Sequence, residues 1–131
     1  MGNALSTDRA VELVKMLDDR PLWESRDCAV RALAVAADVS YLLVHDLMQQ
    51  AGRKRGHRTK RQQSARVAAE LGLRRYDVNT TLARFLDDAQ YVPRLAAFVR
   101  GHAFGMVRGE VIDVEPAGKP RSIVQFYYSK G

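Results

Sequence analysis

Residues 27–36 read Asp27-Cys28-Ala29-Val30-Arg31-Ala32-Leu33-Ala34-Val35-Ala36. Asp27 is a favourable N-cap residue, and the apolar spacing after it predicts a helix with almost no polar face. Such a helix is expected at the centre of a fold. Its first turn would hold Cys28, the one cysteine of the chain, where free backbone N–H groups and the helix dipole favour a thiolate. The stretch therefore predicts a core helix that carries a nucleophile.

Further helices are predicted on both sides of this stretch. Apolar residues at helical spacing predict a helix that ends before Pro21, one from Ser40 to Gly52, one that ends at Gly72 and one capped by residues 79–81. Residues 53–61 contain no apolar side chain and are expected to form an exposed loop.

Strands are expected mostly in the last third of the chain. Apolar, β-branched and aromatic residues predict them at 73–78, 95–99, 102–107, 110–114 and 123–128. Helices that precede strands predict an α+β fold, in which N-terminal helices, with the Cys28 helix at their centre, pack on a C-terminal antiparallel sheet. A length of 131 residues with 47% hydrophobic content suits a single domain over residues 1–131.

Residues 101–113 predict a hairpin that brings a histidine near an acid. A two-residue turn at 108–109 would place His102, Phe104 and Asp113 on one face, with Phe104 opposite Asp113. His102 and Asp113 would then be diagonal neighbours, ~7–8 Å apart between backbones. A turn one residue longer would move Asp113 to the other face.

Cys28, His102 and Asp113 together supply the groups of a cysteine hydrolase. A thiolate attacks an acyl carbon, an imidazole transfers the proton, and a carboxylate orients the imidazole. Taken singly, a lone cysteine is more often a small buried hydrophobe, and a histidine at the end of a strand often binds backbone groups. The three together, in this order, predict a catalytic triad.

The motifs Asp-Cys-x-x-Arg-Ala-Leu-Ala at 27–34 and Gly-His-Ala at 101–103, with Asp113 ending the hairpin, resemble those of small papain-like cysteine peptidases, many of them encoded by bacteriophages. The resemblance spans residues 24–115. It implies a papain-like fold and a peptidase or amide hydrolase that acts on peptides or proteins without a cofactor.

The chain departs from the papain-like pattern before the cysteine. Papain-like enzymes usually have a glutamine there that donates to the oxyanion, and residues 21–26 contain neither Gln nor Asn. Trp23 N–H, the Ser25 hydroxyl or Arg26 are the candidate substitutes. A missing donor costs about 100-fold or more in rate. The alternative is therefore a catalytically weak or silent papain-fold binding module.

The positive charge of the chain is local. Residues 53–75 carry a net charge of +8 in a chain of net charge +6. Within them, the segment 53–61 contains no Phe, Tyr or Trp on which bases could stack. This segment could bind nucleic acid, an acidic host protein or an acidic substrate, or be a solvated loop that attracts polyanions nonspecifically. The candidate basic patch consists of Arg53, Lys54, Arg55, Arg58, Lys60 and Arg61.

Composition sets further expectations. A single cysteine forms no intramolecular disulfide, so a cytoplasmic location is expected, in the host if the protein is phage-encoded. No apolar run approaches the ~20 residues that cross a bilayer, so no membrane association is expected. His45, His57 and His102 lie apart without zinc-ligand spacing, which predicts no metal site. The sequence leaves the oligomeric state open.

Overall fold

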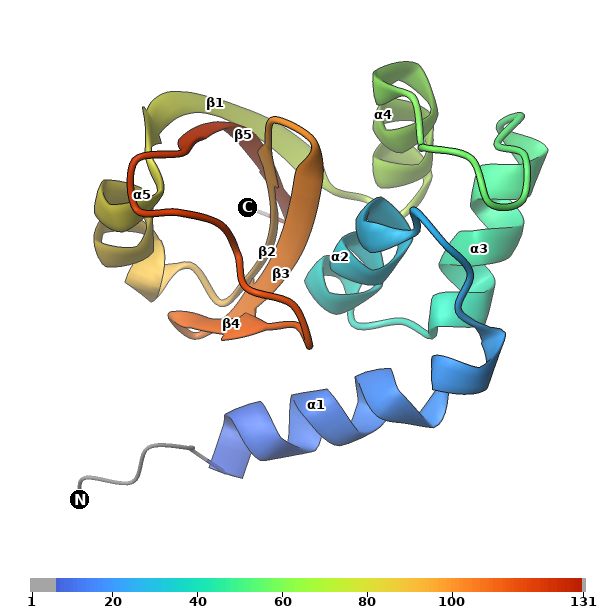
Figure 1. Ribbon diagram of the computed structural model, residues 1–131, viewed down its shortest axis with the longest axis horizontal. Coiled ribbons are helices and arrows are strands. Elements are labelled where there is room, and N and C mark those ends of the chain that lie inside the picture. The colour runs from blue at the N-terminus through green and yellow to red at the C-terminus, as the bar shows by residue number, and fades with distance from the viewer. Residues whose placement is uncertain (1–6, 131) are drawn as a thin grey trace.

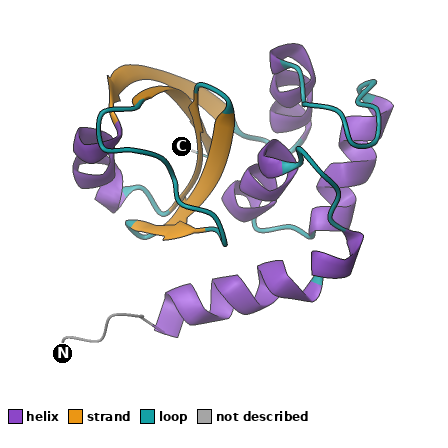
Figure 2. Ribbon diagram, viewed as in Figure 1, coloured by secondary structure: helices purple, strands orange, loops and turns teal. Residues whose placement is uncertain are grey.

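The computed structural model describes residues 7–130 as five α-helices and a five-stranded antiparallel sheet, which confirms the α+β class (Figures 1 and 2). The helices are α1 (Thr7–Asp18), α2 (Cys28–Ala37), α3 (Tyr41–Gln50), α4 (Arg61–Glu70) and α5 (Leu82–Asp88), with short 3₁₀ turns at Arg20–Leu22 and Ala89–Tyr91. The strands are β1 (Arg74–Thr81), β2 (Arg94–Val99), β3 (His102–Val107), β4 (Glu110–Ile112) and β5 (Ile123–Ser129).

The sheet has the order β1-β5-β2-β3-β4, and its β3–β4 hairpin has the expected register. Arg108 and Gly109 form the two-residue turn, both with positive φ, as a type I′ hairpin turn requires. The ladder ends at Gly105 opposite Ile112, so the expected pairing of Phe104 with Asp113 does not form. The prediction of a strand to residue 114 was wrong, because the Asp113 carboxylate accepts the N–H groups of the next two residues and turns the chain.

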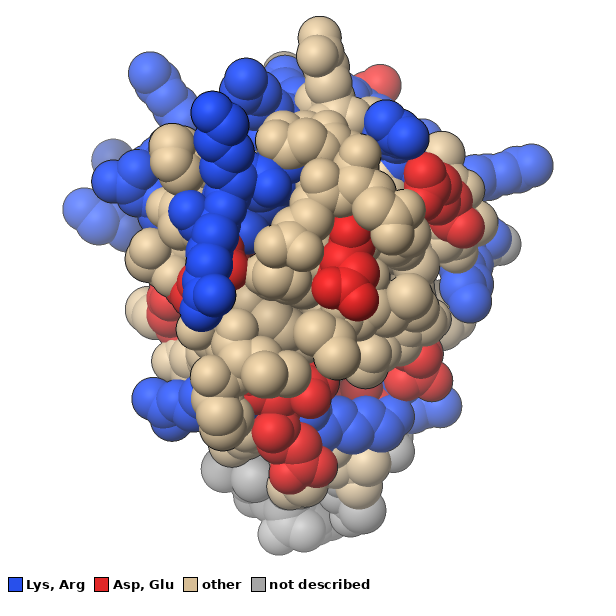
Figure 3. Space-filling view, turned by 90° about the vertical axis from the view of Figure 1, so that its right-hand side faces the viewer, with Lys and Arg blue, Asp and Glu red and all other residues tan. Residues whose placement is uncertain are grey.

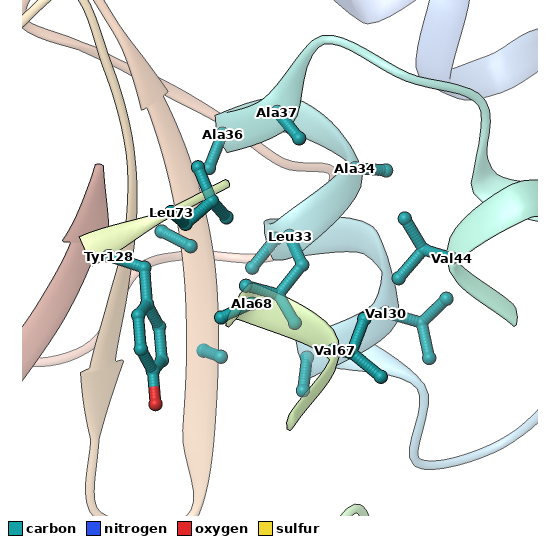
Figure 4. Close-up of a cluster of buried hydrophobic side chains, with 14 of the residues drawn as sticks. Val30, Leu33, Ala34, Ala36, Ala37, Val44, Val67, Ala68, Leu73 and Tyr128 are labelled. Carbon is teal, nitrogen blue, oxygen red and sulfur yellow. The ribbon is translucent and has the colours of Figure 1, made fainter. Parts of the chain in front are cut away.

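Helix α2 is the centre of the fold, as expected. It lies between the sheet and α3, and every residue from Ala29 to Ala37 is buried (Figures 1 and 4). Gly105 of β3 allows the helix to approach the sheet closely, because a Cβ there would lie 2.5 Å from the Cβ of Val35. Val30 and Leu33 are fully buried against α3 and α4. The position of Cys28 is thus fixed by the packing of the whole helix.

The opposite face of the sheet is also covered. Leu82 and Phe85 of α5 pack against Leu95, Phe104 and Met106 in a second core. Burial on both faces explains why β3 is an almost continuous apolar run instead of an alternating one. The sequence predicted α5 as a helix but not its place behind the sheet.

Helix α1 forms where it was expected, but part of the apolar stripe that helical spacing predicts for it, Ala10, Leu13, Val14 and Leu17, faces solvent. Val14 and Leu17 are 58% and 39% exposed, whereas Glu12 and Met16 are buried. Met16 packs beside Ile112, and Glu12 accepts two hydrogen bonds from Arg94 of β2. A buried ion pair thus replaces part of the apolar contact that helical spacing predicts.

Candidate active site

Cys28 is the first residue of α2 and is partly buried. Asp27 occupies the predicted N-cap position, but its side chain makes no capping hydrogen bond. Burial raises the pKa of the Cys28 thiol, and the N–H groups of Ala103 and Ala29 and the charge of Arg31 only partly oppose that rise. Desolvation thus opposes the thiolate that the helix N-terminus and the neighbouring donors would favour.

His102 opens β3 directly after a tight turn at Gly101, and it lines the same cleft as Cys28. Its Nε2 lies 3.7 Å from Oδ2 of Asp113, and its Nδ1 lies 4.0 Å from Oε2 of Glu115. His102 Nε2 is buried without a hydrogen-bond partner. Asp113 Oδ2 is therefore placed to accept a hydrogen bond from His102 Nε2–H when the contact shortens.

The two carboxylate oxygens of Asp113 have different partners. Its Oδ1 accepts from Arg31 Nη1 at 2.6 Å and from the N–H of Val114 at 2.7 Å, while Oδ2 faces His102. Its side chain is only 2% exposed. Burial raises the pKa of Asp113, and Arg31 and the backbone N–H groups of Val114 and Glu115 oppose that rise. The structure thus brings all three predicted triad residues to one end of the sheet.

Arg31 is the residue that the sequence interpretation passed over, although it stands inside the decisive motif. It is buried on α2 and bonds to Asp27, Asp113 and Glu115. Burial lowers the pKa of Arg31, but the three carboxylates outweigh burial and raise it. A single arginine in an otherwise apolar helix was the available signal, because a buried charge requires partners.

A second buried network fixes the loop that leads into Cys28. Glu24 accepts hydrogen bonds from Arg53 Nη1 at 2.6 Å and from the Gly56 N–H at 2.7 Å, and His45 Nε2 lies 2.8 Å from its other oxygen. Arg53 also donates to the backbone oxygen of Arg26. Burial would raise the pKa of Glu24, but the hydrogen bonds from these three residues lower it to about 2.

The structure corrects the predicted basic patch at two residues, Arg53 and Arg61. Arg53 was expected to be exposed, but its side chain is 0% exposed because Glu24 and the Arg26 carbonyl hold it inside the protein. Arg61 begins α4 and does not belong to the loop. The other members, Lys54, Arg55, Arg58, Lys60 and Arg61, are exposed. Lys and Arg side chains crowd the upper left of the face in Figure 3.

The cleft that contains Cys28 and His102 has a volume of about 710 Å³. Phe98 and Phe126 line it from the sheet, and Arg58 comes from the segment before α4. Among residues 7–130, the buried side-chain polar atoms without a hydrogen-bond partner belong to Trp23, Arg53, Thr59 and His102, and all of these residues but Arg53 line this cleft. Buried polar groups are otherwise almost always satisfied, so such a cluster marks a candidate functional site.

The loop before Cys28 narrows the choice of oxyanion donor. The Trp23 indole N–H is buried and closed to solvent, whereas Ser25 and Arg26 are exposed and line the cleft. Arg26 has a φ of 60°, the left-handed region that a side chain rarely adopts. Strain of this kind persists only where neighbouring contacts hold it, here the bond from Arg53.

Searches against known protein families, curated proteins and solved structures found no match for this chain. Within residues 7–130, no group of three or more His, Cys, Asp or Glu side chains is arranged to hold a metal ion. No single helix in the same range is long and apolar enough to cross a membrane; α2 and α3 reach that length and composition only together, as a pair bent by 119°. The site has to be interpreted from its own geometry.

Proposed function

We propose that the protein is a cysteine hydrolase, a peptidase or amide hydrolase, with Cys28 as nucleophile, His102 as general base and acid, and Asp113 as the group that orients His102. The observation that carries this proposal is that Cys28 and His102 line one cleft while Asp113 lies 3.7 Å behind the imidazole. Contacts of this kind are often long in a free enzyme and shorten when substrate binds.

The proposed chemistry starts from a neutral thiol. Nε2 of His102 faces Asp113, so Nδ1 is left to take the proton of Cys28 as the sulfur attacks the acyl carbon. The imidazolium then gives this proton to the leaving amine, and an acyl thioester remains. Water hydrolyses the thioester with His102 again as base, which regenerates the thiol and releases the acid.

Backbone N–H groups at the start of α2 would stabilise the oxyanion. They have no partner within the helix, and Cys28 is its first residue. Ser25 and Arg26 line the same cleft and could supply the second donor. A helix opened by cysteine, packed on a sheet that carries histidine and acid, is the arrangement of papain-like peptidases, and we extend the proposal to that fold.

The second candidate function is a binding module with an idle triad, which binds a host protein or nucleic acid through residues 53–61. The raised pKa of the Cys28 thiol and the exposed charges of Lys54, Arg55, Arg58, Lys60 and Arg61 support it. The two functions differ in whether His102 activates Cys28.

The test is acylation of Cys28 by p-nitrophenyl acetate, followed by release of p-nitrophenolate and by the mass of the acyl-protein. His102→Ala should lower the acylation rate at pH 7 by about 100-fold, the lower end of the range for a positioned general base. His57→Ala, a change of an exposed histidine outside the cleft, should leave the rate unchanged. Equal rates in the parent protein and in His102→Ala would contradict the hydrolase and favour the binding module.

A further inference from the structure

The cleft around Cys28 contains arginines of two kinds. Arg31 bonds to carboxylates of the protein itself, as does the neighbouring Arg53, and both are buried. The exposed arginines that line the cleft make no ion pair with any carboxylate within residues 7–130; they are Arg26, Arg58, Arg61 and Arg100. Their positive charge is left for a ligand.

The acids that line the same cleft do not cancel this charge. Glu24 is bound by Arg53, and Asp27 and Glu115 are bound by Arg31. Arg31, which also lines the cleft, is shared between these two acids and Asp113, yet the described lining residues still include five arginines against three acids. The solvent-facing side of the cleft is left with an excess of unpaired guanidinium groups.

One of these arginines, Arg61, lies beside the aromatic floor of the cleft. Phe98 and Phe126 stack with ring centroids 4.9 Å apart, and the Arg61 guanidinium lies 5.5 Å from the Phe126 centroid. Arg61 is also hydrogen-bonded to the side-chain oxygen of Gln125. These contacts hold Arg61 over the floor of the cleft, so that it is positioned before a ligand arrives.

We infer that the cleft binds an acidic peptide, with carboxylate side chains near the bond presented to Cys28 held by Arg26, Arg58, Arg61 and Arg100. That such a peptide is a substrate rests on the proposed hydrolase function. That it binds as a ligand rests only on the residues that line the cleft. Guanidinium groups match carboxylates in a bidentate geometry, and an acyl bond is what the thiol can attack.

An acidic peptide fits the cleft better than single-stranded nucleic acid does. Binding to single strands uses exposed aromatic rings on which successive bases stack. Phe126 is only 2% exposed, and the other Phe, Tyr or Trp side chains among the described lining residues, Phe98 and Trp23, are partly buried. Arg75 also lies over the Phe126 ring, at 3.9 Å from its centroid, which leaves little of that ring for a base.

The test is the binding of fluorescent hexapeptides to the full chain carrying Cys28→Ala, measured by anisotropy at low and high salt. The peptides share length and sequence, except that the flanking residues are Glu, Gln or Lys. The Glu peptide should bind about tenfold more tightly than the Gln peptide at low salt, the sum of two partly exposed ion pairs, and the difference should shrink with salt.

Matched variants locate the effect. Arg58→Gln with Arg61→Gln should remove the preference for Glu, whereas Arg74→Gln with Arg121→Gln, an equal loss of charge at exposed positions outside the cleft, should keep it. Equal binding of the Glu and Gln peptides would overturn the inference and leave the acylation test of the hydrolase untouched. Displacement of the Glu peptide by oligo-dT at equal concentration would overturn the choice of a peptide.

Discussion

Two buried arginines lie close to Cys28, and they hold their surroundings in different ways. Arg31, on α2, binds three carboxylates, one of which, Asp113, comes from a position 82 residues away beside β4. Arg53 binds one carboxylate, Glu24, and joins two loops. Glu24 also contacts His45 and accepts from the Gly56 N–H, and Asp113 also lies near His102 and accepts from the N–H groups of Val114 and Glu115. The difference is that three carboxylates share the guanidinium of Arg31, whereas Arg53 serves one.

The largest expected effect comes from removing that guanidinium. Arg31→Met keeps an unbranched side chain of similar length but leaves Asp27 and Asp113 buried without their main partner. Breaking a buried ion pair on one side costs about 3–5 kcal/mol, and we expect the free energy of unfolding in urea to fall by that amount.

Arg53→Met is the matched control for this change. Only one carboxylate loses its guanidinium in this variant, and it keeps the Gly56 N–H and the His45 contact, so we expect a loss of about 2 kcal/mol. Equal losses of unfolding free energy in the two variants would show that the folded protein depends on the two arginines to the same extent.

The loop-side network can be tested alone by acid. The pKa of Glu24 is lowered from 4.5 to about 2, so its ionised form stabilises the fold at pH values above 4.5. This contribution, at most about 3 kcal/mol, should be lost as the pH falls from 4.5 through 2, because the unfolded chain binds the proton first. The measurement is the unfolding free energy of the parent and of Glu24→Gln between pH 6 and pH 2.

The parent should lose more stability than Glu24→Gln over this range, and the two curves should converge near pH 2. Parallel curves would mean that the contacts with Arg53, Gly56 and His45 do not lower the pKa of Glu24 in the folded protein. The comparison needs only the difference between the curves, so other carboxylates that titrate in both proteins do not affect it.

The sequence was sufficient where the pattern is local. Helical spacing and turn residues placed Cys28 at the start of α2 and His102 at the start of β3, and a two-residue turn predicted the register of the hairpin. Asp113 lies close to His102 even though β4 ends at Ile112, the residue before it. Local rules therefore predicted which elements carry the site.

The partners of buried charges could not be predicted in the same way. Arg53 stood among exposed basic residues, and nothing nearby in the sequence distinguishes it; its partner Glu24 lies 29 residues earlier. Arg31 was visible as a charge in an apolar helix, but two of its three partners lie more than 80 residues away. Periodicity reports which face of an element is buried and carries no information on pairs so distant.

The smallest expected effect comes from changing Tyr41, which contacts Asp27 at one end of the Arg31 network and not Asp113 at the other. Tyr41 donates its O–H to Oδ2 of Asp27 at 2.7 Å, and Asp27 also accepts from Arg31 and from the Glu24 N–H. Burial and the Asp27 carboxylate raise the pKa of Tyr41, so the O–H remains a donor well above neutral pH. Tyr41→Phe removes one hydrogen bond to a charged group and should cost about 1.5–2 kcal/mol in urea unfolding.

Acylation of Cys28 in Tyr41→Phe should stay within about twofold of the parent, because Arg31 still holds both Asp27 and Asp113. The matched control is Tyr76→Phe, a change of a partly exposed tyrosine that stacks on Tyr127 away from the cleft. If the acylation rate fell as much in Tyr41→Phe as in Arg31→Met, this expectation would be contradicted. Arg31 would then act mainly by fixing Asp27 at the start of α2, and the geometry of Cys28, not that of Asp113 and His102, would be what the buried arginine maintains.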